Sequence, residues 1–139
     1  MKQIADIMTK KVVTVEMDDK LSLIEILLED RRFKHLPVVD EEKQLMGIVS
    51  DRDLRAALTP FLHTPAETKR DTALLHRHVH QIMTRKPVTV TPEDAIDYGA
   101  RLLLINEIPS LPVINAQNHV VGIVSWEDIL CFYTRQSID

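Results

Sequence analysis

The sequence predicts an α/β (α+β) protein that is built from two copies of one β-α-β-β-α unit. Three observations lead to this prediction. The chain matches itself without a gap when it is shifted by 75 residues. Short apolar runs alternate with segments of helical spacing, and polar stretches separate the paired runs. Finally, 139 residues are enough for one compact domain or for two small modules that support each other.

The repeat covers roughly fifty residues in each half of the chain. A single offset accounts for every matching block, whereas chance similarities would need different offsets. Asp53 and Asp128 also share this offset. The blocks are Ile7–Thr9 with Ile82–Thr84, Val13–Val15 with Val88–Val90, Leu36–Val38 with Leu111–Val113, and Gly47–Ser50 with Gly122–Ser125. We therefore interpret the two halves as a duplication.

A short apolar strand opens each predicted unit, over Val12–Val15 in the first copy and Val88–Val90 in the second. A helix follows in both copies, because apolar residues recur at helical spacing from Leu21 and from Ile96. In the second copy Thr91 is predicted to be the N-cap of this helix, with a proline in the first turn.

Two strands and a second helix complete each unit. The strands are predicted at residues 36–39 and 45–49 in the first copy and at 111–114 and 120–124 in the second. Polar residues at 40–44 and 115–119 supply the hairpin turns. The second helix is expected to start near Asp51 and near Trp126.

The segment between the copies contains two prolines and many charged residues. We predict a surface loop from Thr59 to Thr68 and a helix from Asp71 to Met83 that leads into the second copy. The predicted domains are therefore residues 1–58 and 78–139, with a connector at residues 59–77.

The composition restricts the possible functions. The chain has a formal charge of −4 and therefore lacks the excess of basic residues that is typical of a nucleic-acid-binding protein. The apolar runs are too short for a membrane span, and the first residues do not form a signal peptide. The single cysteine, Cys131, fits a reducing cytoplasm. No catalytic motif is present, so we expect a cytoplasmic protein that is not an enzyme and contacts neither membrane nor nucleic acid.

Both copies carry an ordered set of motifs that resembles the CBS domain family. The set is I-M-T-x-x-x-V-T-V, then L-P-V-V-D, then G-I-V-S-D-R-D-L in the first copy. The resemblance implies a Bateman module, in which two CBS domains pack with pseudo-two-fold symmetry and leave two clefts for AMP, ADP, ATP or S-adenosylmethionine. It also implies a homodimer that signals to a regulated protein. The chain is similar to the CBS portion of acetoin-utilisation-type proteins, so a standalone CBS-domain protein is expected.

The resemblance also implies which residues line the clefts. The aspartate of G-h-h-S-x-x-D can accept hydrogen bonds from both ribose hydroxyls, and the serine lies at a helix N-terminus that favours anions. A plain capping box is the alternative interpretation of the same S-x-x-D spacing. For the first cleft the predicted residues are Val12, Val13, Thr14, His35, Pro37, Ser50, Arg52 and Asp53, and for the second, weaker cleft they are Pro87, Val88, Thr89, Ser110, Pro112, Ser125 and Asp128.

The two predicted clefts differ in charge. Arg52 in the first copy corresponds to Glu127 in the second, and His35 corresponds to the neutral Ser110. Because a guanidinium binds phosphate and a carboxylate repels it, we expect the Asp53 cleft to bind a phosphorylated adenosine ligand more tightly than the Asp128 cleft.

Other hypotheses remain open. The chain could be an oligomerisation module with no working ligand site, or a sensor of S-adenosylmethionine or of a metal. His76 and His80 invite the metal hypothesis because they would lie one helical turn apart. We favour solvated histidines on a connector helix, and predict an adenine nucleotide ligand with no metal site and no required cofactor.

Overall fold

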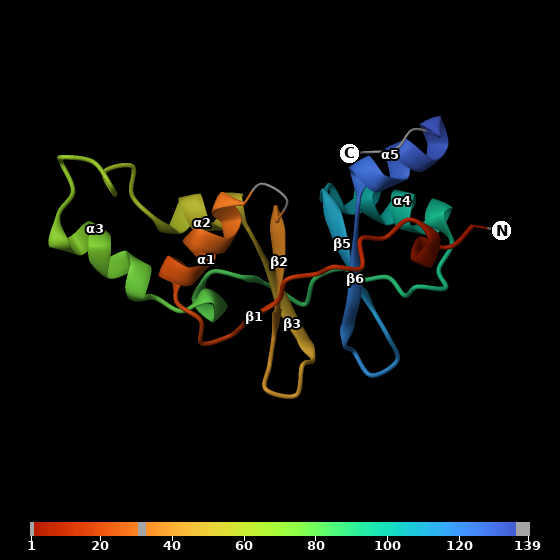
Figure 1. Ribbon diagram of the computed structural model, residues 1–139, viewed down its shortest axis with the longest axis horizontal. Helices are drawn as coiled ribbons and strands as arrows, with labels where there is room; N and C mark the ends of the chain where they lie inside the picture. The colour runs from red at the N-terminus through yellow and green to blue at the C-terminus, as the bar shows by residue number, and fades with distance from the viewer. Residues whose placement is uncertain (1, 31–32, 136–139) are drawn as a thin grey trace. The chain divides into compact units, whose positions relative to one another are not determined.

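The computed structural model describes residues 2–30 and 33–135 (Figure 1). The chain divides into two compact units. Unit 1 contains residues 1–12, 43–45 and 87–139, and unit 2 contains residues 13–42 and 46–86. Both units mix strands and helices, which confirms the predicted α/β class. Within the described residues, no helix has the length and apolar character needed to cross a membrane.

A four-stranded sheet forms the centre of unit 2. Its strands run in the order β1 (Val15–Glu16), β2 (His35–Val39), β3 (Leu45–Ser50) and β4 (Thr84–Arg85). Strand β1 is parallel to β2, with Val15 opposite Val38, and β4 is antiparallel to β3, with Ile48 opposite Thr84. The α-helices of this unit are α1 (Leu21–Glu29), α2 (Asp51–Ala57) and α3 (Lys69–Ala73), and its short 3-10 helices are η2 (Leu74–His76) and η3 (Val79–Gln81).

Unit 1 is built around the antiparallel pair β5 (Ser110–Ile114) and β6 (Val120–Ser125). Its helices are α4 (Ile96–Asn106) and α5 (Trp126–Thr134), which pack against each other, and a 3-10 helix, η1 (Ile4–Asp6), precedes them (Figure 1). Isolated bridges extend the strand pair on both sides, because Val90 pairs parallel with Val113 and Thr9 pairs antiparallel with Ile123.

The strand pairing of one unit reproduces that of the other at the sequence offset. The pairs Val15–Val38 and Ile48–Thr84 in unit 2 correspond to Val90–Val113 and Ile123–Thr9 in unit 1. Each sheet is therefore completed by the segment that precedes the other repeat in the chain. The predicted boundaries at residues 58 and 78 delimit the sequence repeats and stay a prediction. The compact units are divided differently, because residues 2–12 belong to unit 1 with the second repeat and residues 78–86 belong to unit 2 with the first. We call these two stretches the exchanged segments.

Each unit has its own hydrophobic core, to which the exchanged segment contributes. Ile4 is fully buried in unit 1, and its equivalent Val79 is fully buried in unit 2. The buried cluster of unit 2 contains Val15, Leu21, Ile24, Leu36, Val38, Val49, Leu54, Val79 and Met83. That of unit 1 contains Ile4, Val90, Ile96, Leu103, Leu111, Val113, Val124 and Ile129.

Gly47 and Gly122 allow the exchanged segments to approach the sheets. A Cβ atom at Gly47 would lie 2.6 Å from the Met83 sulfur and 2.8 Å from the carbonyl oxygen of Thr84. At Gly122 it would lie 2.7 Å from the Met8 sulfur and 3.0 Å from the Thr9 oxygen. Since these distances are shorter than normal contacts, strand closure explains both glycines without any ligand.

Most predicted elements are confirmed. The hairpins at residues 35–50 and 110–125 have the expected turns, and helices begin at Leu21, Asp51 and Trp126. The first strand of each copy is wrong in extent, because only Val15–Glu16 forms a strand and Val90 makes a single bridge. The chain passes between the units at residues 12–13 and 86–87, so the residues beside these points do not pair.

The predicted start of the helix at Thr91 is wrong. Helix α4 begins at Ile96 with Ala95 as its N-cap. The backbone N–H groups of Ile4 and Ala5 donate to the carbonyl oxygens of Asp94 and Pro92, at 2.8 and 2.9 Å. These carbonyls are therefore committed to the exchanged segment and cannot begin a helix ladder.

The predicted connector helix over residues 71–83 is also wrong. It is broken at Arg77, whose backbone is extended. The N–H groups of Val79 and His80 donate to the carbonyls of Asp19 and Met17, at 2.8 and 3.2 Å, and the Leu21 N–H donates to the Arg77 carbonyl at 2.9 Å. This pairing with residues 17–21 replaces helical hydrogen bonds, so amphipathic spacing alone could not reveal the break.

Candidate functional site

The predicted carboxylates lie at two equivalent helix starts. At the start of α2, Asp53 Oδ2 accepts from the Ser50 N–H and hydroxyl at 2.9 and 3.0 Å, and the Asp53 N–H donates to the Ser50 hydroxyl at 3.2 Å. At the start of α5, Asp128 and Ser125 repeat these bonds at 2.8, 3.0 and 3.2 Å. Both serines are therefore N-caps, and both S-x-x-D motifs form capping boxes.

The capping boxes leave part of each carboxylate available. The hydrogen bonds that each carboxylate accepts all go to Oδ2, and no described residue donates a hydrogen bond to Oδ1 of Asp53 or Asp128. An ionised carboxylate can accept up to four hydrogen bonds. Helix capping and ligand binding are therefore compatible, and the ligand role of these residues stays a prediction.

Unit 2 brings most residues of the first predicted site to one end of its sheet. Strand β2 begins at His35 and β3 ends at Ser50, and a hairpin joins the two strands, so these two ends are adjacent. Val13 and Thr14 lead into β1, which is parallel to β2, and therefore approach the same end. Val12 belongs to unit 1. Pro37 is less than 2% exposed, so its side chain offers little surface to a ligand.

Unit 1 places the second predicted set at the equivalent end of β5 and β6. Ser110 lies directly opposite Ser125, and the Trp126 N–H donates to the Pro109 carbonyl at 3.0 Å. Pro87, Val88 and Thr89 are half-buried and precede the Val90 bridge. Ser110 and Pro112 are buried, so the accessible polar residues of this set are the half-buried Thr89, Ser125 and Asp128.

The charges beside the two aspartates differ as the sequence predicts. Arg52 is exposed and has no hydrogen bond or ion pair with any residue that the structure describes. Its equivalent, Glu127, is half-buried. Near Arg52, the exposed pair Asp51–Arg55 forms an ion pair at 2.8 Å, so Arg55 is already neutralised along the helix. Arg52 is therefore the available cation next to Asp53.

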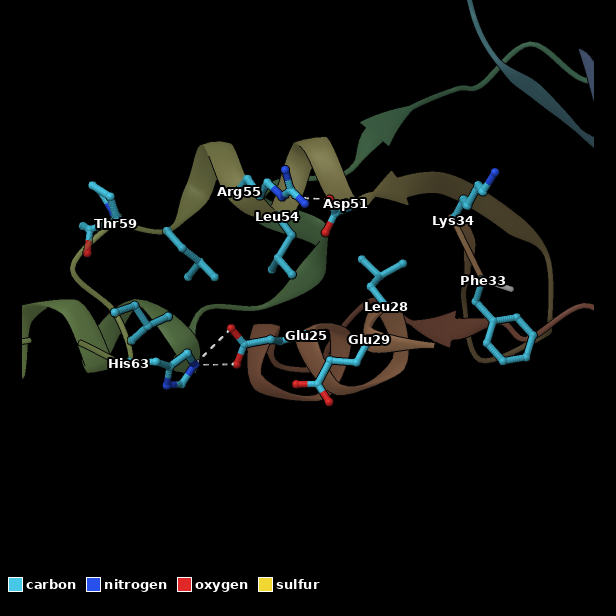
Figure 2. A pocket seen from close by; sticks show the side chains of 13 residues that line it. Glu25, Leu28, Glu29, Phe33, Lys34, Asp51, Leu54, Arg55, Thr59 and His63 are labelled. Carbon is cyan, nitrogen blue, oxygen red and sulfur yellow. Dashed lines mark hydrogen bonds and ion pairs between the residues drawn. The ribbon is translucent and has the colours of Figure 1, made fainter. Parts of the chain in front are cut away.

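A groove that the sequence did not predict lies between α1, α2 and the loop that follows α2. Figure 2 shows the Glu25 carboxylate facing the His63 ring across it. The groove has a volume of about 830 Å³, and it is lined by apolar residues such as Leu28 and Leu54 and by several charged side chains. Its lining residues come from separate parts of the chain, so no local motif announces it.

Glu25 and His63 form the best-defined polar contact of this groove. The His63 Nε2 atom lies 3.0 and 3.2 Å from the two carboxylate oxygens of Glu25. This hydrogen bond, together with the negative charge of Glu25, raises the pKa of His63 above its ordinary value. His63 adopts a left-handed backbone conformation with φ of 63°, in a position where its ring reaches α1.

The connector histidines are arranged differently from the prediction. His76 ends the 3-10 helix η2 and is exposed, whereas His78 and His80 are half-buried on the other side of the break at Arg77. His76 and His80 are therefore not one helical turn apart. Instead, ligand atoms of Asp18, His78 and His80 all lie within 4.8 Å of one another.

Comparison with protein families identifies both halves of the chain. The sequence model of the CBS domain matches residues 4–60 and again residues 79–134. A CBS domain-containing protein of Dictyostelium discoideum is 32% identical over 128 residues, which cover 91% of this chain and 88% of that protein. A homoserine O-acetyltransferase of Methanococcoides burtonii is 31% identical over 126 residues. The match covers 91% of this chain and only 23% of the enzyme.

Solved structures of CBS domain proteins match most of the chain. A CBS domain pair in complex with 5′-methylthioadenosine and S-adenosyl-L-methionine superimposes with a TM-score of 0.79, at 26% identity and with 97% and 98% of the two chains covered. A CBS protein in complex with AMP gives a TM-score of 0.80 at the same identity and coverage. A protein of Vibrio cholerae assigned to acetoin utilization gives 0.79 at 26% identity, with 97% and 92% covered.

Proposed function

Since the chain belongs to the CBS domain family and carries the domain twice, we propose that it is a cytosolic regulatory module that binds an adenosine-containing nucleotide. AMP, ADP or ATP is the expected ligand class, and a partner protein is expected to respond to the bound state. Binding would favour one of two arrangements of the protein, because a ligand shifts an equilibrium only by its difference in affinity for the two states. The enzymes among its relatives match only over their CBS portions, which supports regulation over catalysis.

One observation carries this proposal. Each unit has an aspartate in a capping box whose Oδ1 atom receives no hydrogen bond from the described residues, at the sheet end where the other predicted contacts gather. A carboxylate beside a helix N-terminus can bind the ribose diol while backbone N–H groups attract phosphate. AMP in one similar structure and S-adenosyl-L-methionine in another share the adenosine group that such a site would recognise.

A thermal-shift panel on protein stripped of bound ligand tests the proposal. AMP, ADP, ATP, S-adenosylmethionine and NAD are compared, each at several concentrations. A ligand present at 100 times its dissociation constant should raise the free energy of unfolding by about 2.7 kcal/mol. A melting temperature that none of the five compounds changes would contradict the proposal and favour a module without a working ligand site.

The variant Asp53→Asn separates ligand binding from helix capping. Its amide oxygen can still accept a hydrogen bond from the Ser50 N–H, while an NH2 group replaces the second oxygen and cannot accept hydrogen bonds from the ribose hydroxyls. We expect affinity for the nucleotide to fall roughly 10–100-fold, as for loss of a hydrogen bond to a charged group. Asp94→Asn is the control, because Asp94 Oδ2 accepts the Thr91 N–H at 2.8 Å over the same three-residue spacing, outside the predicted site.

We propose in addition that the protein is a homodimer. The exposed side of α5 carries Trp126, Leu130 and Tyr133 at i, i+4 and i+7, and they are 52%, 52% and 55% exposed. On the neighbouring helix α4, Leu104 and Ile105 are 79% and 77% exposed. Because large apolar side chains gathered on adjacent helices favour association, a second copy of the chain is the expected partner of this surface.

Analytical ultracentrifugation tests this second proposal. The variant Ile105→Glu places a charge within the apolar surface and should convert a dimer into monomers. Gln117→Glu adds the same charge in the exposed β5–β6 turn and should leave the dimer intact. A monomeric wild-type protein at micromolar concentration would overturn the proposal of a homodimer, without bearing on nucleotide binding.

A further inference from the structure

Two histidines and one aspartate converge in unit 2, away from the residues predicted to bind nucleotide. Asp18 lies in the turn before α1, and His78 and His80 flank the buried Val79 in η3. The His80 Nε2 atom is 4.0 Å from Asp18 Oδ1, and the two imidazole rings are 5.6 Å apart between centroids. The three side chains therefore form one compact group of nitrogen and oxygen donors.

The backbone holds the two segments of this group together. The N–H groups of Val79 and His80 donate to the carbonyls of Asp19 and Met17, and Lys20 forms an antiparallel bridge with His78. The side-chain oxygen of Gln81 accepts the His78 N–H at 2.8 Å, which fixes the turn. The three donors thus project from segments that are already joined, and only side-chain rotations remain to be ordered on binding a ligand.

The chemistry of the group selects the ligand. Imidazole nitrogen with one carboxylate is a donor set that suits Zn²⁺ and similar divalent transition metals better than Mg²⁺ or Ca²⁺. Donor atoms around a tetrahedral Zn²⁺ are separated by roughly 3–3.6 Å, given metal–ligand distances of about 2.0–2.2 Å. The observed separations of up to 4.8 Å need only a small contraction of exposed or half-buried side chains.

The surroundings also favour a cation. Asp18 lines a second hollow, of about 270 Å³, together with Glu16, Asp40, Glu41 and Glu42. Clustered carboxylates raise the local concentration of cations near the histidines. We propose that Asp18, His78 and His80 bind a divalent transition metal such as Zn²⁺, with water completing the coordination on the exposed side.

Unit 1 provides an internal comparison. The positions that correspond to His78, His80 and Asp18 are Gln3, Ala5 and Glu93. The same backbone arrangement is present there, since Gln3 bridges Ala95 as His78 bridges Lys20. Backbone pairing therefore does not require histidines at these positions, and the metal-binding side chains are a feature of unit 2 alone. A bound metal would join the connector to the turn before α1 and stabilise unit 2 selectively.

Calorimetric titration of Zn²⁺ into untagged, chelator-treated protein tests the site. We expect one Zn²⁺ per chain. His78→Ala and His80→Ala should each weaken binding by more than the roughly 10–100-fold that is typical of losing a supporting residue around a metal. His76→Ala is the matched control, because His76 is an exposed histidine of the same connector outside the group, and its affinity should equal that of the wild type.

Melting curves of the metal-free variants exclude a folding defect, and Co²⁺ absorption in the visible range reports coordination by the protein directly. Unchanged Zn²⁺ affinity in the double variant His78→Ala/His80→Ala would overturn the proposal, as would an equal loss in His76→Ala. The test is independent of the nucleotide hypothesis, since the double variant leaves Ser50, Asp53 and Arg52 in place and its thermal shift with adenine nucleotides is measured separately.

Discussion

Unit 1 and unit 2 share a backbone arrangement but differ in the side chains that could carry function. The equivalent pairs Val15–Val38 and Val90–Val113 keep the same register. Each sheet also pairs with an exchanged segment, through β4 in unit 2 and through the Thr9 bridge in unit 1. In contrast, Arg52 corresponds to Glu127, and His80 corresponds to Ala5. The duplication thus preserves buried positions and backbone pairing, while equivalent positions outside the cores have diverged in charge and in donor atoms.

This difference indicates where selective chemistry can lie. The capping boxes are nearly identical, with Ser–Asp side-chain bonds of 3.0 Å in both units, so they cannot distinguish the two sites. Any difference in ligand affinity must come from neighbouring charges and from the groups that each unit alone contains. The groove with Glu25 and His63 and the Asp18 histidine group both belong to unit 2.

Truncating Ile4 or Val79, the fully buried residues of the two exchanged segments, should give the largest changes in stability. Ile4→Ala removes a fully buried side chain from the core of unit 1 and should cost about 2–5 kcal/mol of the free energy of unfolding. Val79→Ala makes the equivalent change in unit 2 with a smaller side chain and should cost less. Urea unfolding measures both, and Lys2→Ala, an exposed neighbour of Ile4, is the control. If Ile4→Ala lowers the free energy of unfolding by less than about 0.5 kcal/mol, the scale of ordinary surface substitutions, the segment does not contribute to the core as described.

The two glycines sharpen the same comparison. Gly47→Ala brings a Cβ within 2.8 Å of a backbone oxygen, which cannot rotate away, so we expect a destabilisation of about 1–3 kcal/mol. Gly122→Ala meets a backbone oxygen at 3.0 Å and a flexible methionine at 2.7 Å, so its cost should be smaller. Denaturant midpoints of the two variants measure this order, and the reverse order would show that strand closure is tighter in unit 1.

The sequence predicted the fold well because the duplication is visible when the chain is compared with itself, and because hairpin turns and helical spacing are local signals. Such patterns predicted strands from Leu36 and Leu111, each one residue after the observed start, and helix starts near Asp51 and Trp126. The failures share one physical cause. Hydrogen bonds between the exchanged segments and residues 17–21 or 92–95 override the local preferences of Thr91 and of the connector, and such long-range pairing leaves no periodic pattern. The Asp18 histidine group depends on the same long-range pairing, and the groove depends on a different contact, between Glu25 on α1 and His63 in the loop after α2.

Charge exchange beside the two aspartates should change ligand affinity more modestly. If the Asp53 site binds a phosphorylated ligand with help from Arg52, Arg52→Glu should reduce affinity for AMP by roughly tenfold or more, since one hydrogen bond to a charged group is worth about 1.5–3 kcal/mol. Glu127→Arg should strengthen binding at the Asp128 site. Calorimetry with AMP and with uncharged adenosine provides the control, because adenosine binding should respond weakly to both changes. Equal responses of both ligands would refute the phosphate role of Arg52.

The smallest effect concerns the pH dependence of the Glu25–His63 contact in unit 2. The hydrogen bond and charge of Glu25 raise the pKa of His63 in the folded state. The folded protein therefore binds the proton of His63 more tightly than the unfolded chain does. The contact therefore stabilises the protein fully below the ordinary histidine pKa of about 6.5, and this contribution is lost as the pH rises through the raised folded value.

The difference in melting temperature between the wild type and His63→Gln should accordingly be largest below a pH of about 6.5 and decrease as the pH rises through the raised pKa of His63. Because the ring is exposed and solvent screens the pair, the effect is expected to be small at any pH. His76→Gln, an exposed histidine outside the groove, should show no such pH-dependent difference. Unit 1 has Ala100 at the position equivalent to Glu25, so this pH response is predicted to arise from unit 2. A difference that grows with rising pH would mean that the neutral ring, and not the charged one, forms the stabilising contact.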